Sequence, residues 1–215
     1  MKRTLAILTV MGITAGIAQA DIILEYLFTD ESRDATTEHA NVLSSDSFVT
    51  STGTSNFITT ASPPNSPALS SSGWSTSNEP SRYWLFGLEL EPGWEFADSP
   101  DSLTLDFVYR ATGTGPVNYQ LDYDSGSGFT TLDSGTINND SNWNSSGDID
   151  LSALAGTSGS VQFRLGGYNA DSSSGTWALD SVTLSGTMIP EPGTTALMLM
   201  GFLGIAAARR KLFKR

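Results

Sequence analysis

Apolar and polar side chains alternate with a period of two in several segments of the chain, and short stretches rich in Gly, Ser and Asn separate these segments. In residues 103–110 every second side chain is large and apolar, and the same pattern returns at 117–123 and 161–165. The apolar positions of the first segment are Leu103, Leu105, Phe107 and Tyr109. A period of two places successive side chains on opposite faces of a strand, so each segment is predicted to be a half-buried β-strand.

Further strands are expected throughout the central part of the chain, with no segment that has the period of an amphipathic helix. The additional candidates are 22–28, 40–43, 47–50, 83–90, 129–132, 149–154 and 177–184. About ten short strands predict an all-β domain over 21–187: a two-layer antiparallel β-sandwich, with a jelly roll as the expected form. The segment 53–81 is rich in Ser, Thr, Asn and Pro and is predicted to be the longest loop.

The charge of residues 21–189 excludes several classes of partner. This segment holds 22 Asp and Glu against 4 Arg and no Lys, which leaves 18 net negative charges. Such a surface repels nucleic acid and anionic lipid. The chain has no cysteine, so neither disulfides nor thiol chemistry are available to it.

Candidates for catalysis are few. His39 is the only histidine, and no serine lies in a G-x-S-x-G segment, so a Ser-His-Asp arrangement has little support. The many carboxylates leave open a third possibility, a secreted hydrolase that uses a pair of acids. The sequence predicts a protein that is not an enzyme.

The first 20 residues have the composition of a secretory signal peptide. Lys2 and Arg3 precede an apolar run over 5–18, and Ala18-Gln19-Ala20 is an A-x-A cleavage site before Asp21. We therefore expect the Sec translocon and signal peptidase as partners, and export of the mature chain from Asp21.

The last 27 residues form a second signal. An Ile-Pro-Glu-Pro-Gly-Thr segment at 189–194 precedes an apolar run at 195–208 and a basic end. The prolines favour an extended segment that is open to an enzyme. A helix over 195–208 would span about 21 Å of a core about 30 Å thick, which suits a transient inner-membrane anchor with its basic end in the cytoplasm. A plain single-pass tail anchor is the alternative.

Segment 188–215 resembles the PEP-CTERM sorting signal of Gram-negative envelope proteins. The residues that carry the motif are Pro190, Glu191, Pro192 and Gly193. The resemblance implies a single C-terminal transmembrane helix and processing by an exosortase, a membrane-embedded cysteine transpeptidase or protease. It also implies a destination at the cell surface or in an extracellular matrix, with exopolysaccharide as a possible partner.

The final predicted strand is irregular at Asp180. Its apolar residues occupy both parities, so the strand is either buried on both faces or contains a bulge near Asp180. Segments 161–168 and 175–186 together resemble the closing hairpin of jelly-roll domains similar to carbohydrate-binding modules. That resemblance implies a structural calcium held by Asp180 and Glu25. The alternative is a carboxylate held by hydrogen bonds, with Arg164 as its ionic partner.

Aromatic residues suggest a second function class, a glycan-binding module of the envelope or biofilm matrix. Trp74, Trp94 and Trp143 lie among turn-forming residues and are candidates for an exposed platform, whereas Trp84 and Trp177 follow strand patterns and are expected in the core. The acidic segment 122–128 lacks the later ligand positions of a calcium loop and is expected to be a hairpin turn.

Overall fold

The structure, a computed structural model, describes residues 20–59, 67–98, 103–191 and 193. These residues form an eight-stranded sheet, a six-stranded sheet and a two-stranded ribbon, all with antiparallel pairing. One short 3₁₀-helix, η1 (Ser152–Leu154), lies between strands.

The larger sheet has the order β12-β9-β15-β1-β2. In addition, β13 pairs with β9, and β6 pairs with both β15 and β5. Its strands are β1 (Asp21–Tyr26), β2 (Thr37–Glu38), β5 (Ser55–Ile58), β6 (Ala68–Ser72), β9 (Thr104–Ala111), β12 (Asn144–Ser145), β13 (Ile149–Asp150) and β15 (Thr176–Gly186).

The smaller sheet has the order β11-β10-β14-β7-β3, with β4 also paired to β7. Its strands are β3 (Val42–Ser45), β4 (Val49–Thr50), β7 (Tyr83–Leu90), β10 (Asn118–Asp124), β11 (Thr130–Thr136) and β14 (Ser160–Tyr168). The ribbon joins β8 (Trp94–Phe96) to β16 (Met188–Pro190).

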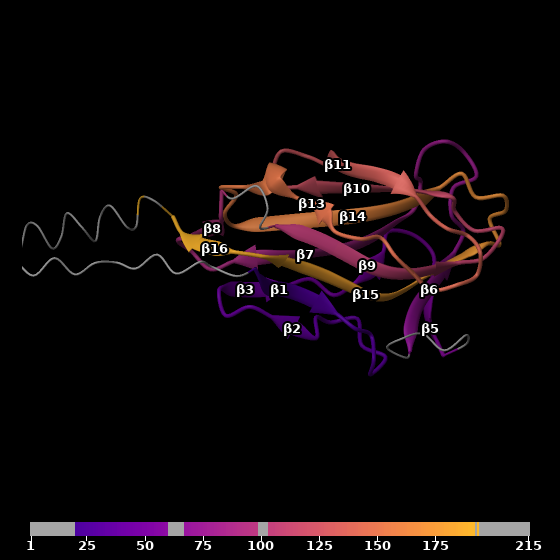
Figure 1. The fold of residues 1–215 in the computed structure, drawn as a ribbon, viewed down its shortest axis with the longest axis horizontal. Coiled ribbons are helices and arrows are strands. Elements are labelled where there is room, and N and C mark those ends of the chain that lie inside the picture. The colour runs from indigo at the N-terminus through magenta and orange to yellow at the C-terminus, as the bar shows by residue number, and fades with distance from the viewer. Residues whose placement is uncertain (1–19, 60–66, 99–102, 192, 194–215) are drawn as a thin grey trace, which may run out of the picture.

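The two sheets pack face to face, and Figure 1 shows β10, β11 and β14 in one layer over β9, β15 and β1 in the other. Rings from both layers meet in the core: Phe107 of β9 lies 5.4 Å from Tyr119 of β10, and Tyr26 of β1 lies 6.1 Å from Phe86 of β7, centroid to centroid. The chain crosses repeatedly between the layers, as in a jelly roll. The predicted all-β sandwich is confirmed.

The strand predictions rest on alternation, and β9 shows why they succeed. Its burial alternates along the whole strand, with Leu105, Phe107, Tyr109 and Ala111 inside. The prediction at 83–90 matches β7, and the segments 117–123 and 161–165 match β10 and β14. The predicted strand at 149–154 is shorter, because η1 begins at Ser152.

The predicted long loop at 53–81 is wrong. Two strands, β5 and β6, lie within it and pair with each other, and β6 also pairs with β15. Several of the serines that suggested a loop lie in β6, and Ser70 and Ser71 are buried there. Serine fits a narrow buried strand because its small hydroxyl can reach a backbone carbonyl, as Ser71 Oγ does at Thr54 O, 3.0 Å away.

The predicted closing hairpin is also wrong. β14 and β15 lie in different sheets: β14 pairs with β10 and β7, whereas β15 pairs with β9, β1 and β6. The seven residues between β14 and β15 limit how far apart the two strands can lie, but they do not decide whether the strands pair. Here the connection crosses from one layer to the other.

The irregularity at Asp180 is a β-bulge. Leu179 pairs with Tyr109 and Ser181 with Val108, so β15 contains one additional residue, Asp180, at this point of its register with β9. On the other edge of β15, the pairing with β6 ends at Leu179 and the pairing with β1 extends as far as Val182. Asp180 therefore lies where β15 changes neighbours, and its side chain is fully buried.

Candidate functional site

The sorting motif begins inside the folded part of the chain. β16 pairs with β8, with Met188 opposite Phe96, Ile189 opposite Glu95 and Pro190 opposite Trp94. Two backbone hydrogen bonds flank this ladder: Ala97 N donates to Thr187 O and Glu191 N donates to Gly93 O, both at 2.9 Å. We call this pair of strands the motif ribbon.

Proline fits the motif ribbon because of its position. In an antiparallel ladder, successive backbone N–H groups point to opposite edges of the strand. Glu191 N points to β8, so the nitrogen of Pro190 points away from β8 and the missing donor costs no ladder bond. The extended conformation expected at the motif is confirmed for Met188–Pro190. The expected openness is wrong on one edge, which β8 occupies; Pro192 lies outside the described residues.

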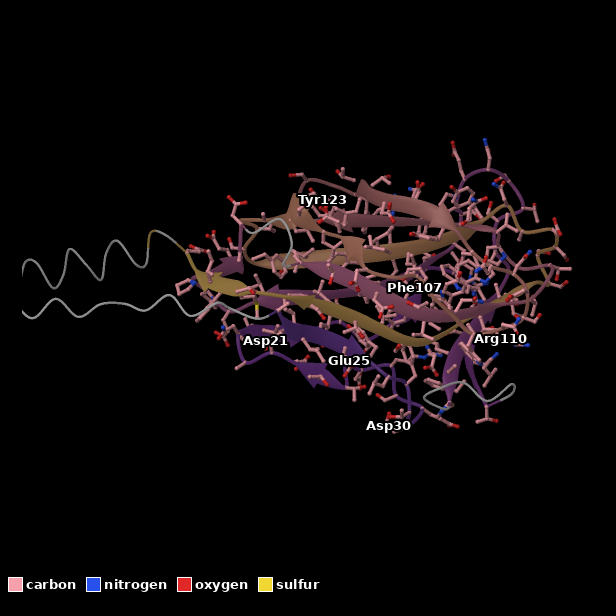
Figure 2. All side chains as sticks on the ribbon, viewed as in Figure 1. Asp21, Glu25, Asp30, Phe107, Arg110 and Tyr123 are labelled. Carbon is pink, nitrogen blue, oxygen red and sulfur yellow. The ribbon has the colours of Figure 1, made fainter. Side chains whose placement is uncertain are left out.

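The two ends of the domain meet at one end of the sandwich. Asp21, the first residue of β1, pairs with Gly186 at the end of β15, and β16 follows after Thr187. Figure 2 labels Asp21 at the same end of the molecule as β16. Ala20 is exposed beside this end, whereas Ala18 lies outside the described residues. The predicted cleavage point of the signal peptide and the sorting motif are therefore neighbours.

The structure does not bring Glu25 to Asp180. Glu25 pairs with Thr183, three positions further along β15, or roughly 10 Å in an extended strand. Its Oε2 accepts a hydrogen bond of 3.0 Å from Thr37 Oγ1 of β2, at the edge of the sheet. Among the residues that the structure describes, no group of three or more His, Cys, Asp and Glu has a metal-binding arrangement. The two predicted ligands do not fit one calcium ion, and calcium at Asp180 stays a prediction.

Arg164 has a different partner from the one expected. Its Nε lies 2.6 Å from Oδ2 of Asp122, which is the residue opposite it on β10. Asp122 is almost fully buried and also accepts a 2.8 Å hydrogen bond from Gln120 Nε2. The guanidinium carbon lies 4.5 Å from the ring centre of Tyr83 and 4.3 Å from that of Phe129. Arg164 thus links the outer residues of the smaller sheet rather than Asp180.

The three tryptophans predicted to form a platform do not lie together on one surface. Trp74 is 1% exposed, and its ring centre lies 5.5 Å from Trp84 and 5.1 Å from Trp177. The prediction that Trp74 is exposed is therefore wrong. Trp94 is half-buried in the motif ribbon, and Trp143 is half-buried before β12. The core positions of Trp84 and Trp177 are confirmed.

A groove crosses the outer face of the smaller sheet. Its main hollow has a volume of ≈ 390 Å³, and Phe129, Val49 and Leu85 form an apolar wall there. Two adjoining hollows, of ≈ 110 Å³ and ≈ 300 Å³, share Gln162 with it. Phe129 is 38% exposed, an unusual degree of exposure for a large ring. No sequence pattern identified this surface, because its residues come from five strands and from the segments that connect strands.

Carboxylates and amides surround the apolar part of the groove. Asp46 borders the first and second hollows, Glu89 the second, and Asp124 the third. Asp124 also closes the β10–β11 turn, where its Oδ1 accepts hydrogen bonds from Gly126 N at 2.7 Å and Gly128 N at 2.9 Å. These bonds hold the pKa of Asp124 below its usual value. The predicted hairpin turn at 122–128 is confirmed.

His39 has no catalytic arrangement. It lies between β2 and β3, and its Nδ1 accepts a hydrogen bond of 3.2 Å from the backbone of Asn41. A histidine of a Ser-His-Asp triad instead donates from Nδ1 to the carboxylate. The local turn thus occupies the atom that a triad would need.

No helix in the described part of the chain has the length and apolar character of a membrane span. The predicted helix over 195–208 and the apolar part of the signal peptide lie outside the described residues.

The sandwich is similar to several solved structures at low identity. Carbohydrate-binding module CBM27-1 of Caldicellulosiruptor saccharolyticus, in complex with mannohexaose, is 14% identical with a TM-score of 0.45; the match covers 77% of this chain and 96% of that one. A cleaved adhesin domain of Lys-gingipain from Porphyromonas gingivalis is 16% identical with a TM-score of 0.43, covering 76% and 98%. At these values the similarities carry no conclusion about ligand or activity.

Comparison by sequence gives one specific result. No curated protein matches the chain. A family model described as the PEP-CTERM protein-sorting motif matches residues 189–211, which include the end of β16. The expected family resemblance is confirmed over this segment, and the chain is a β-sandwich protein that carries a PEP-CTERM protein-sorting motif at 189–211.

Proposed function

We propose that this protein is an exported, non-enzymatic component of the cell surface or extracellular matrix, whose C-terminal signal an exosortase removes. The observation that carries the proposal is the match of 189–211 to the PEP-CTERM protein-sorting motif. The signal-peptide pattern ending at Ala20 supports export independently, since it lies at the other end of the chain.

The fold is compatible with this route. Asp21 and the motif ribbon lie at one end of the sandwich. A C-terminal membrane segment would therefore hold the domain by this end, with the rest of the sandwich on one side of the membrane. The acidic segment 21–189 would be repelled by anionic lipid headgroups, which favours release from the membrane after cutting.

The first prediction tests sorting. In a host that has an exosortase, the mature protein is expected to begin at Asp21 and to lack everything from Thr195 onward. Intact-mass spectrometry of the native protein measures both ends. Alanine in place of Pro190, Glu191 and Pro192 is expected to leave uncut precursor in the inner membrane. Native protein that retains Arg215 would contradict processing and favour a plain tail anchor.

A second candidate function, glycan binding, is favoured by the groove on the smaller sheet rather than by the predicted tryptophans. Pyranose rings offer apolar faces to an exposed aromatic ring and hydroxyls to carboxylates and amides. Phe129 supplies the ring, while Asp46 and Gln162 supply the polar groups. Because Asp46, Glu89 and Asp124 are acidic, the expected ligand is an uncharged polysaccharide.

The second prediction tests the groove. If the groove binds a neutral polysaccharide, Phe129→Ala is expected to weaken affinity roughly tenfold or more, because central aromatic residues dominate such contacts. Affinity gel electrophoresis of residues 21–187 in a mannan, a xylan and a glucan measures this. Ile22→Ala, which alters another exposed apolar residue on the larger sheet, is the matched control. Equal retardation of both variants, or none with the parent, contradicts glycan binding at this groove.

The same purified domain tests the third possibility. Turnover of a polysaccharide that a single Asp or Glu substitution abolishes would replace the non-enzymatic proposal with a carboxylate-dependent hydrolase.

A further inference from the structure

We propose that β8 competes with the processing enzyme for the sorting motif, so that the motif ribbon must open before the tail is cut. This inference rests on the proposed sorting function. It makes β8, which lies about ninety residues before the motif in sequence, a part of the sorting signal.

β8 occupies one edge of the backbone of the motif. An extended peptide is bound by enzymes and receptors largely through its main-chain N–H and C=O groups. In the motif ribbon, Glu191 N already donates to Gly93 O, and Thr187 O accepts from Ala97 N. Ile189 lies opposite Glu95 between these two bonds. One edge of the segment from Thr187 to Glu191 is therefore unavailable to an enzyme while the ribbon is closed.

In the motif ribbon, β8 is held by the domain, whereas β16 can detach from it. Phe96 is fully buried, and its backbone exchanges hydrogen bonds with Thr157 O at 3.1 Å and Gly156 N at 2.9 Å. A bridge joins Glu95 to Ser158 on the same edge of β8. β16 has no fully buried residue, since Met188 and Ile189 are half-buried and Pro190 is exposed. A pairing of three residues with so little burial can open without loss of the core.

No spacer separates the motif from the folded domain. Only Thr187 separates β16 from β15, the central strand of the larger sheet. An enzyme whose active site lies in the membrane cannot approach Pro190 closely while that residue lies against the folded domain. Detachment of β16 from β8 supplies several extended residues between the sandwich and the motif, at about 3.3 Å per residue.

A disulfide across the ribbon tests the proposal. Glu95 and Ile189 are directly opposite, and opposed residues of an antiparallel pair have Cα atoms about 5.5 Å apart, within the range that a disulfide spans. The chain has no cysteine, so Glu95→Cys/Ile189→Cys introduces a single possible intramolecular bond. Both positions are half-buried, and neither is a proline or the glutamate of the motif.

The expected result is that the oxidised double variant keeps its C-terminal tail, with processing at least tenfold slower than the parent, and that reductant restores the parent rate. Each single-cysteine variant controls for loss of the native side chain. Asn118→Cys/Thr136→Cys, across the β10–β11 pair, controls for a disulfide elsewhere. The melting temperature of each variant checks that the domain is folded.

Processing of the oxidised double variant at the parent rate would overturn the proposal, because the enzyme would then cut a closed ribbon. This outcome is distinct from failure of the sorting function itself, in which the parent protein also keeps its tail. Slow processing of both the double variant and Ile189→Cys alone would also overturn the proposal, since the enzyme would then recognise the Ile189 side chain directly.

Discussion

Replacement of Trp74 by alanine is expected to lower the free energy of unfolding by about 3–5 kcal/mol, the range for removal of a large buried aromatic side chain. Trp74 is 1% exposed and lies between Trp84 and Trp177. Its Nε1 donates a 2.9 Å hydrogen bond to Ser71 O, so the substitution also leaves a buried carbonyl without this donor. Chemical denaturation of residues 21–187 measures the change.

Trp143→Ala is the matched control, because Trp143 is half-buried and lies outside the central aromatic group. It is expected to lower the free energy of unfolding by clearly less than Trp74→Ala, because a half-buried side chain loses less buried apolar area when it is truncated. The comparison separates the two readings of Trp74. A Trp74→Ala protein of parental stability that no longer binds a polysaccharide would restore the platform predicted from sequence and contradict the buried position.

Replacement of Arg164 by alanine is expected to cost a similar amount, about 3–5 kcal/mol, for an electrostatic reason. Asp122 is 1% exposed, and Arg164 is its ionic partner at 2.6 Å. Removal of one member of a buried pair leaves an uncompensated charge whose desolvation is no longer offset. The variant also removes the cation that lies over the rings of Tyr83 and Phe129. The melting temperature, measured by thermal unfolding, is expected to fall by roughly 10 °C for a domain of this size.

Two further variants make this test specific. Arg110→Ala removes a half-buried arginine whose Nε donates a solvent-exposed 2.7 Å hydrogen bond to Ser141 O, and it is expected to change stability by less than about 1 kcal/mol. Asp122→Leu/Arg164→Met removes both charges and is expected to recover much of the loss, because a pair of apolar residues leaves no buried charge. An Arg164→Ala protein as stable as Arg110→Ala would contradict a structural role for the pair.

The sequence predicted correctly what depends on neighbours along the chain. Alternation in 103–110 reports which side chains of one strand share a face, and β9 buries that set. The double parity around Asp180 indicated either a strand buried on both faces or a bulge, and β15 contains the bulge, where an extra residue reverses the alternation within the strand. The sorting motif is a linear signal, so its residues could be identified without any knowledge of the fold.

The sequence failed where the outcome depends on which strands become neighbours. Periodicity cannot tell whether β14 and β15 pair with each other or lie in opposite layers, and this choice gave Arg164 the partner Asp122 instead of Asp180. Trp74 follows polar residues that favour exposure, yet it packs beside Trp84 of β7 and Trp177 of β15. The groove around Phe129 has the same origin, because its residues come from separate strands.

Residues that are close along the chain were sufficient to identify most strands of the sandwich, such as β9, and the sorting motif at 189–211. Contacts between distant segments place Trp74 in the core, pair Arg164 with the buried carboxylate of Asp122, and cover one edge of the motif at Ile189 with β8. The physical reason is that burial and pairing are properties of long-range strand contacts, which local side-chain patterns do not encode.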